Sequence, residues 1–258
     1  FNGLVGDVAF PREGTQATTY WIGEAEDVTE STPGFNQVTM SPKTAGATSD
    51  LTRKIIQQSS LSVEMWLRGH LAQKLAIAGD LAAIHGTGAN GPPLGILNTS
   101  GIGDVAGGTD GAAVTYAHLV ALEEAVAIDN ALKGRLSFVT NPKVRATLRN
   151  AFINTTGGDT PIWQGGLEGE VMGYDARATN QVSITLLKLN SSATGAHSAV
   201  LFGDFTSLFL GFWGGLDING DTATLSKSGG IRVVALQDMD VAVAHVESFA
   251  AMQDATTA

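Results

Sequence analysis

The sequence lacks cysteine altogether, so neither a disulfide framework nor a thiolate metal site is possible. Charged side chains are also scarce: Asp, Glu, Lys and Arg make up 16% of the 258 residues, against roughly 25% in an ordinary soluble domain. No uncharged apolar run approaches the roughly 18 residues that a membrane-spanning helix needs. The sequence therefore excludes a disulfide-stabilised scaffold and predicts no membrane-spanning helix.

Positive charge is in shorter supply than negative charge. The 15 basic and 25 acidic residues leave a net charge of −10, whereas a nucleic-acid-binding domain usually carries a basic patch. Glycine is in excess, with 32 residues, about 12% of the chain against a usual ~7%. A hydrophobic content of 43% can build a core and argues against disorder. The chain is thus apolar and rich in glycine, yet poor in the charges that keep a monomer soluble.

Two extended runs around an acidic tip predict a long hairpin arm near the start of the chain. Residues 18–22 are β-branched and aromatic, and residues 36–40 alternate polar and apolar side chains. Between them, residues 24–34 contain four carboxylates, a proline and a glycine, which is the composition of a loop. Such an arm buries little apolar surface of its own, so we expect it to need a partner surface.

Helical periodicity is clearest over residues 60–85, where Leu67, Leu71 and Leu75 recur every four residues. About 25 residues at 1.5 Å each give a rod of about 38 Å, long for a domain of this size. Shorter helices are predicted over residues 116–132, after the cap Thr115, and from Pro142 to about residue 151, after the cap Asn141. Strands are predicted at residues 44–56, 136–140, 182–189, 199–202, 208–211, 223–226, 231–236 and 241–246. The fold class is therefore α+β.

Short motifs of catalysis or cofactor binding are weak in this chain. Residues 86–91 match the G-x-G-x-x-G pattern, but a dinucleotide loop follows a strand, and this segment follows a predicted helix. We interpret it as a turn that ends the helix. Residues 217–221 resemble a calcium loop without its closing glutamate, and we predict a turn there and another at residues 237–240.

The histidines show no metal-ligand spacing, and the motifs of a serine nucleophile are missing from the sequence. The five histidines are His70, His85, His118, His197 and His245. We therefore expect no metal, no cofactor and no enzymatic activity, and a structural role instead.

Six segments together carry a family resemblance. The most specific is the predicted long helix with the loop at residues 86–98, GTGANGPPLGILN. The other five are residues 38–45, 136–142, 173–175, 201–205, and 231–235 with 240–243. In chain order they resemble the major capsid protein of tailed double-stranded DNA bacteriophages, whose fold is shared with encapsulin shells and gene transfer agent capsids.

The resemblance implies an α+β tailed-phage capsid fold in three parts. Residues 1–50 would form an N-terminal remnant and an extended arm, the E-loop, and residues 253–258 a C-terminal tail. The peripheral (P) domain would comprise residues 51–111 and 223–252, with a spine helix at about 60–85, and the axial (A) domain residues 112–222. It also implies an upstream scaffold-like segment, which we expect to be lost or unseen before Phe1.

The function implied by the resemblance is structural. Copies of the chain would assemble with one another into hexamers and pentamers of an icosahedral virion shell around double-stranded DNA, in the cytoplasm of a host bacterium. The other implied partners are a portal, a scaffold or maturation protease, and decoration proteins. Two alternatives stay open. An encapsulin-type compartment would show a groove for cargo peptides, and a soluble α+β enzyme would form a small discrete oligomer.

The contacts between copies that we expect join the acidic arm tip to basic residues of the P domain. Some family members cross-link an E-loop lysine to an asparagine of a neighbour, but residues 24–35 contain no lysine and residues 228–236 no asparagine. We therefore expect a shell without covalent cross-links. The expected tip residues are Glu24, Glu26, Asp27, Glu30, Pro33 and Phe35. The expected P-domain residues are Arg53, Lys54, Arg68, Lys227 and Arg232.

Overall fold

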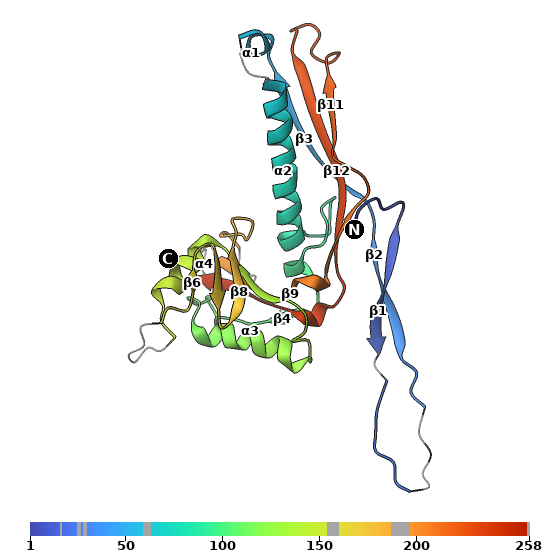
Figure 1. Cartoon of the computed structure of the whole chain (residues 1–258), viewed down its shortest axis with the longest axis vertical. Helices are drawn as coiled ribbons and strands as arrows, with labels where there is room; N and C mark the ends of the chain where they lie inside the picture. The colour runs from blue at the N-terminus through green and yellow to red at the C-terminus, as the bar shows by residue number, and fades with distance from the viewer. Residues whose placement is uncertain are drawn as a thin grey trace.

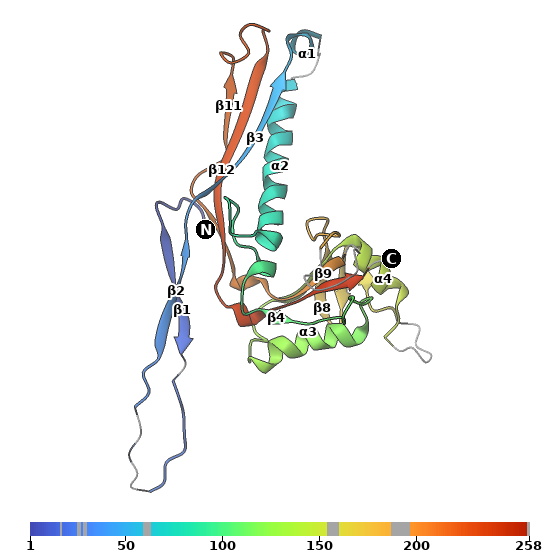
Figure 2. The ribbon, with the colours of Figure 1, turned by 180° about the vertical axis from the view of Figure 1, so that it is seen from behind.

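The computed structural model describes residues 1–15, 17–24, 27, 30–58, 63–153, 160–186 and 197–256 of the chain. They form an elongated molecule in which a hairpin arm and a narrow slab of helix and sheet extend in opposite directions (Figure 1). A compact body lies beside the junction of the two. The view from behind shows the same three parts well separated (Figure 2).

The arm is an antiparallel hairpin of β1 (Val8–Thr15) and β2 (Gly34–Met40) with a long connecting loop. The predicted strand at residues 36–40 is confirmed as part of β2. The strand predicted at residues 18–22 is wrong, because these residues have no regular structure and the strand lies earlier, at β1. A strand needs a hydrogen-bonded partner. The partner strand β2 begins only at Gly34, because Pro33 before it has no N–H to donate to a ladder. β-Branched composition alone was a misleading signal there.

The slab is a four-stranded antiparallel sheet with the long helix α2 (Val63–His85) packed on one face. Its strands are β3 (Lys43–Leu51), β10 (Leu208–Phe212), β11 (Asp217–Asp221) and the central β12 (Ile231–Val243). Leu67, Leu71 and Leu75 are buried between α2 and β12, and burial of each contributes ~1.5–3 kcal/mol. The predicted long helix is thus confirmed, and its 23 residues span about 34 Å.

Several predicted boundaries along this sheet are wrong. The turn predicted at residues 237–240 lies inside β12, because the buried Asp240 carboxylate is compensated there by the Lys43 ammonium at 2.7 Å and the Ser41 N–H at 2.9 Å. Residues 217–221 form β11 rather than a turn, and residues 223–226 form a turn rather than a strand. Asp221 accepts the Ala223 N–H and bends the chain at that point. The strand predicted over residues 44–56 ends at Leu51, and a short helix, α1 (Arg53–Gln58), follows.

The body is built on a seven-stranded mixed sheet in the order β4-β13-β9-β5-β8-β7-β6. These strands are β4 (Gly103–Asp104), β13 (Phe249–Thr256), β9 (His197–Asp204), β5 (Leu136–Thr140), β8 (Tyr174–Ala178), β7 (Glu168–Val171) and β6 (Gln164–Gly165). Helices α3 (Tyr116–Ile128) and α4 (Pro142–Asn150) bury Leu119, Leu122 and Leu148 against the sheet.

Both predicted helix caps of the body are confirmed. Thr115 and His118 form a capping box at the start of α3, and the Asn141 side chain accepts the Val144 N–H at 2.9 Å at the start of α4. Helix α3 ends at Ile128, earlier than predicted, because Asn130 takes a left-handed conformation with φ 54°.

The strands predicted at residues 136–140, 199–202 and 208–211 are confirmed, but β13 and the β6–β7 hairpin lie in segments where we predict none. Strand β13 is rich in alanine, which has a low strand propensity. It forms because it is largely buried beside β9, whose eight residues are all buried. Of the strand predicted at residues 182–189, residues 182–186 show only an isolated bridge between Leu186 and His197. The remainder lies outside the described residues.

Slab and body meet where α2 ends. The Gly86 N–H donates to the Ala82 carbonyl, and the Gly95 N–H returns to the Gly86 carbonyl. A Cβ atom at residue 86 would lie 2.1 Å from the Pro93 carbonyl oxygen, so the turn requires glycine there. The interpretation of residues 86–91 as a helix-ending turn is confirmed. Three short helices border the crossings between slab and body: η1 (Ile96–Asn98), η2 (Phe205–Ser207) and η3 (Val246–Ser248).

Candidate interaction surfaces

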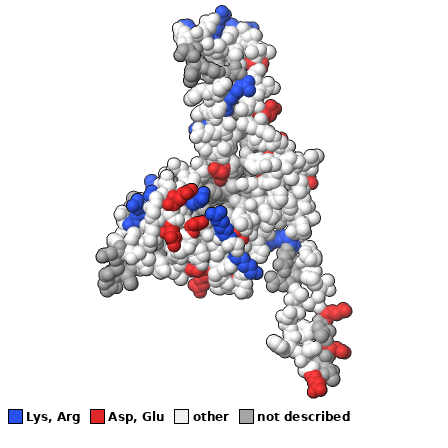
Figure 3. All heavy atoms as spheres, in the orientation of Figure 1, with Lys and Arg blue, Asp and Glu red and all other residues white. Residues whose placement is uncertain are grey.

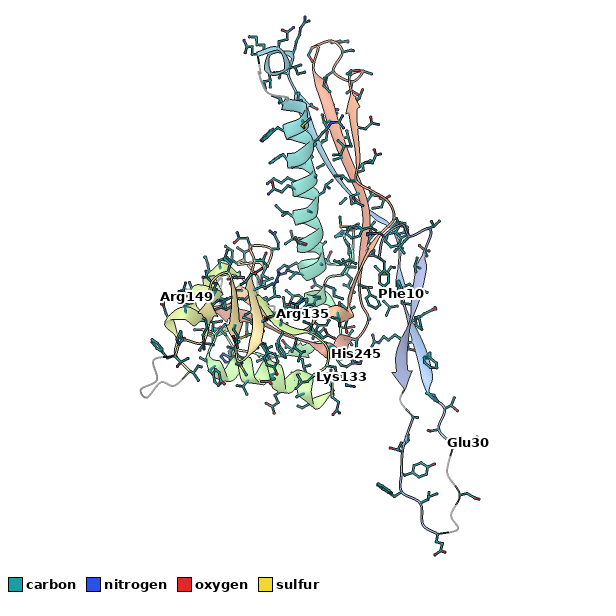
Figure 4. The ribbon with its side chains drawn as sticks, viewed as in Figure 1. Phe10, Glu30, Lys133, Arg135, Arg149 and His245 are labelled. Carbon is teal, nitrogen blue, oxygen red and sulfur yellow. The ribbon has the colours of Figure 1, made fainter. Side chains whose placement is uncertain are left out.

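The end of the arm combines exposed apolar side chains with exposed carboxylates. Trp21 is 103% exposed, Phe35 77% and Ile22 46%. Glu24, Asp27, Glu30 and Pro33 are exposed as well, whereas Glu26 lies outside the described residues. Figure 3 shows the acidic atoms gathered at this end of the molecule, and Figure 4 labels Glu30 on the loop. We call Trp21, Ile22, Glu24, Asp27, Glu30, Pro33 and Phe35 the arm tip.

The root of the arm, in contrast, is held to the rest of the chain. The ring of Phe10 on β1 lies 5.3 Å from the ring of Phe209 on β10, centroid to centroid. An ion pair of 3.4 Å joins the Arg12 guanidinium to the Glu247 carboxylate of η3. The root therefore sits at the junction of slab and body, and the tip extends away from both (Figure 4).

The opposite end of the slab is basic and partly apolar. Arg53 and Lys54 of α1 and Lys227 of the turn after β11 are all exposed. The Arg53 stem packs on this turn, because a Cβ atom at Gly229 would lie 3.1 Å from its Cδ. Basic atoms are visible at this end in Figure 3. Ile55 and Ile56 of α1 are 47% and 40% exposed.

Trp66, on the first turns of α2, adds an aromatic group near this end. Trp66 is 61% exposed, and its ring stacks on the His70 ring with a centroid separation of 5.3 Å and an angle of 8°. The distal surface is defined as Arg53, Lys54, Ile55, Ile56, Trp66 and Lys227.

The other two basic residues that we expect in contacts between copies, Arg68 and Arg232, do not lie on the distal surface. Arg232 of β12 makes a bidentate pair with Asp50 of β3, with Nε–Oδ1 and Nη2–Oδ2 distances of 2.7 and 2.8 Å. This hydrogen-bonded pair raises the pKa of Arg232 and lowers the pKa of Asp50. Arg68 is half-buried on α2. The structure thus gathers Arg53, Lys54 and Lys227 at one end and engages Arg232 within its own sheet.

Sequence reasoning missed the apolar members of both surfaces. Trp21 and Ile22 are predicted as strand residues, and Ile55, Ile56 and Trp66 are not singled out at all. The arm residues could have been found from one pattern: apolar residues lie beside an acidic loop, on a hairpin that has no core in which to bury them. On α2, Trp66 falls outside the row of Leu67, Leu71 and Leu75 that faces the sheet.

The described part of the chain shows no cluster of side chains typical of a metal centre. No group of three or more His, Asp or Glu side chains among the described residues could hold a metal ion. A cavity of about 240 Å³ lies between α2 and the slab sheet, lined mainly by apolar residues such as Leu75, Phe212 and Met239. A search of the described residues for a helix long and apolar enough to cross a membrane found none.

An arm, a long helix on a narrow sheet and a separate mixed-sheet body define the fold of tailed-phage capsid proteins. The capsid of a native gene transfer agent (GTA) particle has a TM-score of 0.75 and 21% identity, covering 99% of this chain and 87% of that chain. The structure titled Gordonia phage Cozz has a TM-score of 0.70 and 17% identity, covering 99% and 84%. The fold that the sequence resemblance implies is confirmed.

The sequence itself establishes the family. The model of the Phage capsid family matches residues 2–254, and the chain belongs to this family. The major capsid protein of Halomonas phage phiHAP-1 is 28% identical over 254 residues, which cover 96% of this chain. The match spans 38% of the length of that relative.

Proposed function

We propose that this chain is the shell-forming part of a major capsid protein. Copies would assemble into hexamers and pentamers of an icosahedral virion shell that encloses double-stranded DNA. The observation that carries the proposal is the arm tip, which places a fully exposed tryptophan and three described carboxylates away from slab and body. Exposed apolar groups of this kind mark interaction sites. Membership of the Phage capsid family supports the same role.

In this proposal the arm tip of one copy docks on the distal surface of another. Carboxylates at the tip would meet Arg53, Lys54 and Lys227, while Trp21 and Phe35 would cover Ile55, Ile56 and Trp66. Exposed ion pairs contribute only ~0.2–1 kcal/mol each, so the buried aromatic groups supply most of the affinity and the charges set the register. Because tip and distal surface are different patches, the contact is heterologous, and such contacts form rings when the rotation from copy to copy closes.

We propose that each sheet of the structure corresponds to one part of the capsid fold. The arm is the E-loop, the slab is the peripheral domain with α2 as spine helix, and the body is the axial domain. The resemblance implies an axial domain of residues 112–222 and places residues 223–252 in the peripheral domain. The pairing of β10 and β11 with β12 instead supports assigning residues 208–221 to the peripheral part. The pairing of β13 with β9 supports assigning residues 249–256 to the axial part.

The proposed role is mechanical and needs no catalytic residue or cofactor. A net charge of −10 suits a container wall that does not adhere to the DNA it holds, since a basic wall would bind phosphates without regard to sequence. The further partners we propose are a portal, a scaffold or maturation protease, and decoration proteins, with assembly in the host bacterial cytoplasm.

We also propose that the shell has no covalent cross-links, because residues 24–35 contain no lysine. Boiled particles on a denaturing gel should run as the single chain. A ladder of multimers would overturn this part of the proposal and leave the shell function standing.

Electron microscopy of the purified chain, combined with charge reversal, tests the function. Wild type should form uniform closed shells. Reversing Glu24, Asp27 and Glu30 to lysine should abolish them, and combining this change with glutamate at Arg53, Lys54 and Lys227 should restore them. A matched control reverses the exposed Asp104, Glu124 and Asp129 of the body, which changes the net charge equally and should leave shells intact. A small discrete oligomer of wild type would refute the shell function.

A further inference from the structure

His85, the last residue of α2, makes a hydrogen bond that only a neutral histidine can make. The Ser183 backbone N–H of the body lies 2.8 Å from the His85 Nε2 atom. A backbone N–H can only donate, so Nε2 must carry a lone pair and the ring proton must sit on Nδ1. Protonation would place an N–H on Nε2 that faces the N–H of Ser183. The bond would then be lost, because two donors would face each other.

The carbonyl group of the same residue, Ser183, is tied into the core of the body. The Ser183 carbonyl accepts a hydrogen bond of 3.2 Å from the Asn141 side-chain amide. Asn141 is fully buried and caps α4 through its other side-chain atom, the Oδ1 that accepts the Val144 N–H. A continuous hydrogen-bonded path therefore runs from the end of α2 through Ser183 to the first turn of α4.

None of the described residues that border the groove around His85 carries a carboxylate that could pair with a charged ring. The groove around the ring is bordered by α2, residues 86–98, residues 183–186 and Gln253 of β13. These described walls carry alanine, leucine, proline, glycine, threonine, asparagine, serine and glutamine residues, so none of them presents a second ionisable group to the ring. Burial accordingly lowers the pKa of His85 from its ordinary value of 6.5.

We propose that His85 is a pH-sensitive latch between the slab and the body, closed when the ring is neutral and open when it is protonated. Opening breaks the hydrogen bond between Ser183 and the end of α2, while Asn141 still holds Ser183 to the body. The sign follows from the lowered pKa. The folded chain binds fewer protons than the unfolded chain, so the stabilising contribution is complete above pH 6.5. It declines as the pH falls below that value and is lost below the pKa of the folded state.

Amide hydrogen exchange on the full chain tests the latch. The measured quantity is the protection factor of the Ser183 amide, taken relative to the unstructured exchange rate at the same pH. In the wild type it should be about fivefold lower at pH 4.5 than at pH 7.5, the effect of losing one hydrogen bond. His85→Gln keeps an acceptor oxygen that does not titrate, so its protection should change less than the wild type's, by under about twofold.

Two further variants complete the design. His70→Gln removes another histidine of the same helix and should behave as the wild type. His85→Phe keeps the ring without an acceptor and should give low protection at both pH values. The proposal is overturned if the wild type keeps full protection at pH 4.5, or if His85→Gln loses as much protection as the wild type. Should His85→Phe fail to fold, the other three proteins still decide the question.

Discussion

Replacing Trp21 by alanine should weaken assembly and leave the folded chain unchanged. The Trp21 side chain is fully exposed, so its removal takes away no contact on which the arm, slab or body depends. We expect the free energy of unfolding of the unassembled chain to change by less than about 0.5 kcal/mol. Its effect should be confined to contacts between copies.

The size of that effect follows from the area that the indole can bury. A tryptophan side chain buries about 150–250 Å², and alanine retains a small part of this, so about 150 Å² of apolar contact is lost. At about 25 cal/mol per Å² this corresponds to about 4 kcal/mol. Ordering the side chain in the wild type costs about 1 kcal/mol. The net loss of about 3 kcal/mol per contact corresponds to about a 150-fold weaker association.

Light scattering measures the lowest chain concentration at which shells form, and thermal unfolding measures the stability of the unassembled chain. Trp21→Ala should raise that threshold by at least about 30-fold, the lower end for a loss of 2 kcal/mol. Ile128→Ala is the matched control, because Ile128 is 72% exposed at the end of α3 and belongs to neither proposed surface. Assembly of Trp21→Ala at the wild-type threshold would refute the reasoning. So would an equal effect of both substitutions.

Three further substitutions test the fold. Asp240→Ala leaves the Lys43 ammonium at the start of β3 without its partner at 2.7 Å and should cost about 3 kcal/mol in chemical unfolding; a change below 1 kcal/mol would contradict a stabilising role of the pair. Asn141→Ala removes the cap of α4 and its bond to the Ser183 carbonyl, and should cost about 2 kcal/mol in the same measurement, whereas Asn141→Ser keeps a capping oxygen and should cost less. Leu71→Ala opens a cavity between α2 and the slab sheet and should cost about 2–4 kcal/mol by denaturant titration; the exposed Leu81→Ala on the same helix is its control.

Local signals in the sequence predicted the helices better than the strands. The buried face of α2 can be predicted from the four-residue spacing of Leu67, Leu71 and Leu75. The start of α4 can be predicted from Asn141 and Pro142, because a helix cap depends on contacts within one turn. Strands depend on partners far away in the chain. β13 forms from an alanine-rich segment because β9 lies beside it, whereas the β-branched and aromatic residues 18–22 are not part of a strand. The composition of a segment does not show which distant strand it pairs with, so neither result could be predicted from the segment alone.

The candidate surfaces show a similar division. An acidic tip on a hairpin arm can be predicted from composition, since residues 24–34 hold their carboxylates close together in the sequence. The basic partner cannot, because Arg53 and Lys227 stand 174 positions apart and are brought to one end only by the packing of α1 on the turn after β11.

A charge that is available to a neighbour differs from a charge already engaged within the chain, and the sequence does not separate the two. Arg53 and Arg232 both belong to the proposed peripheral part and carry the same side chain. Arg232 lies opposite Asp50 in the β3–β12 register, and the bidentate pair occupies its planar fork. Arg53 begins a six-residue helix at the end of the slab and is exposed. Reversing Arg53 should therefore impair assembly first, whereas reversing Arg232 should first disturb the β3–β12 pairing, a difference that unfolding measurements on the unassembled chain resolve.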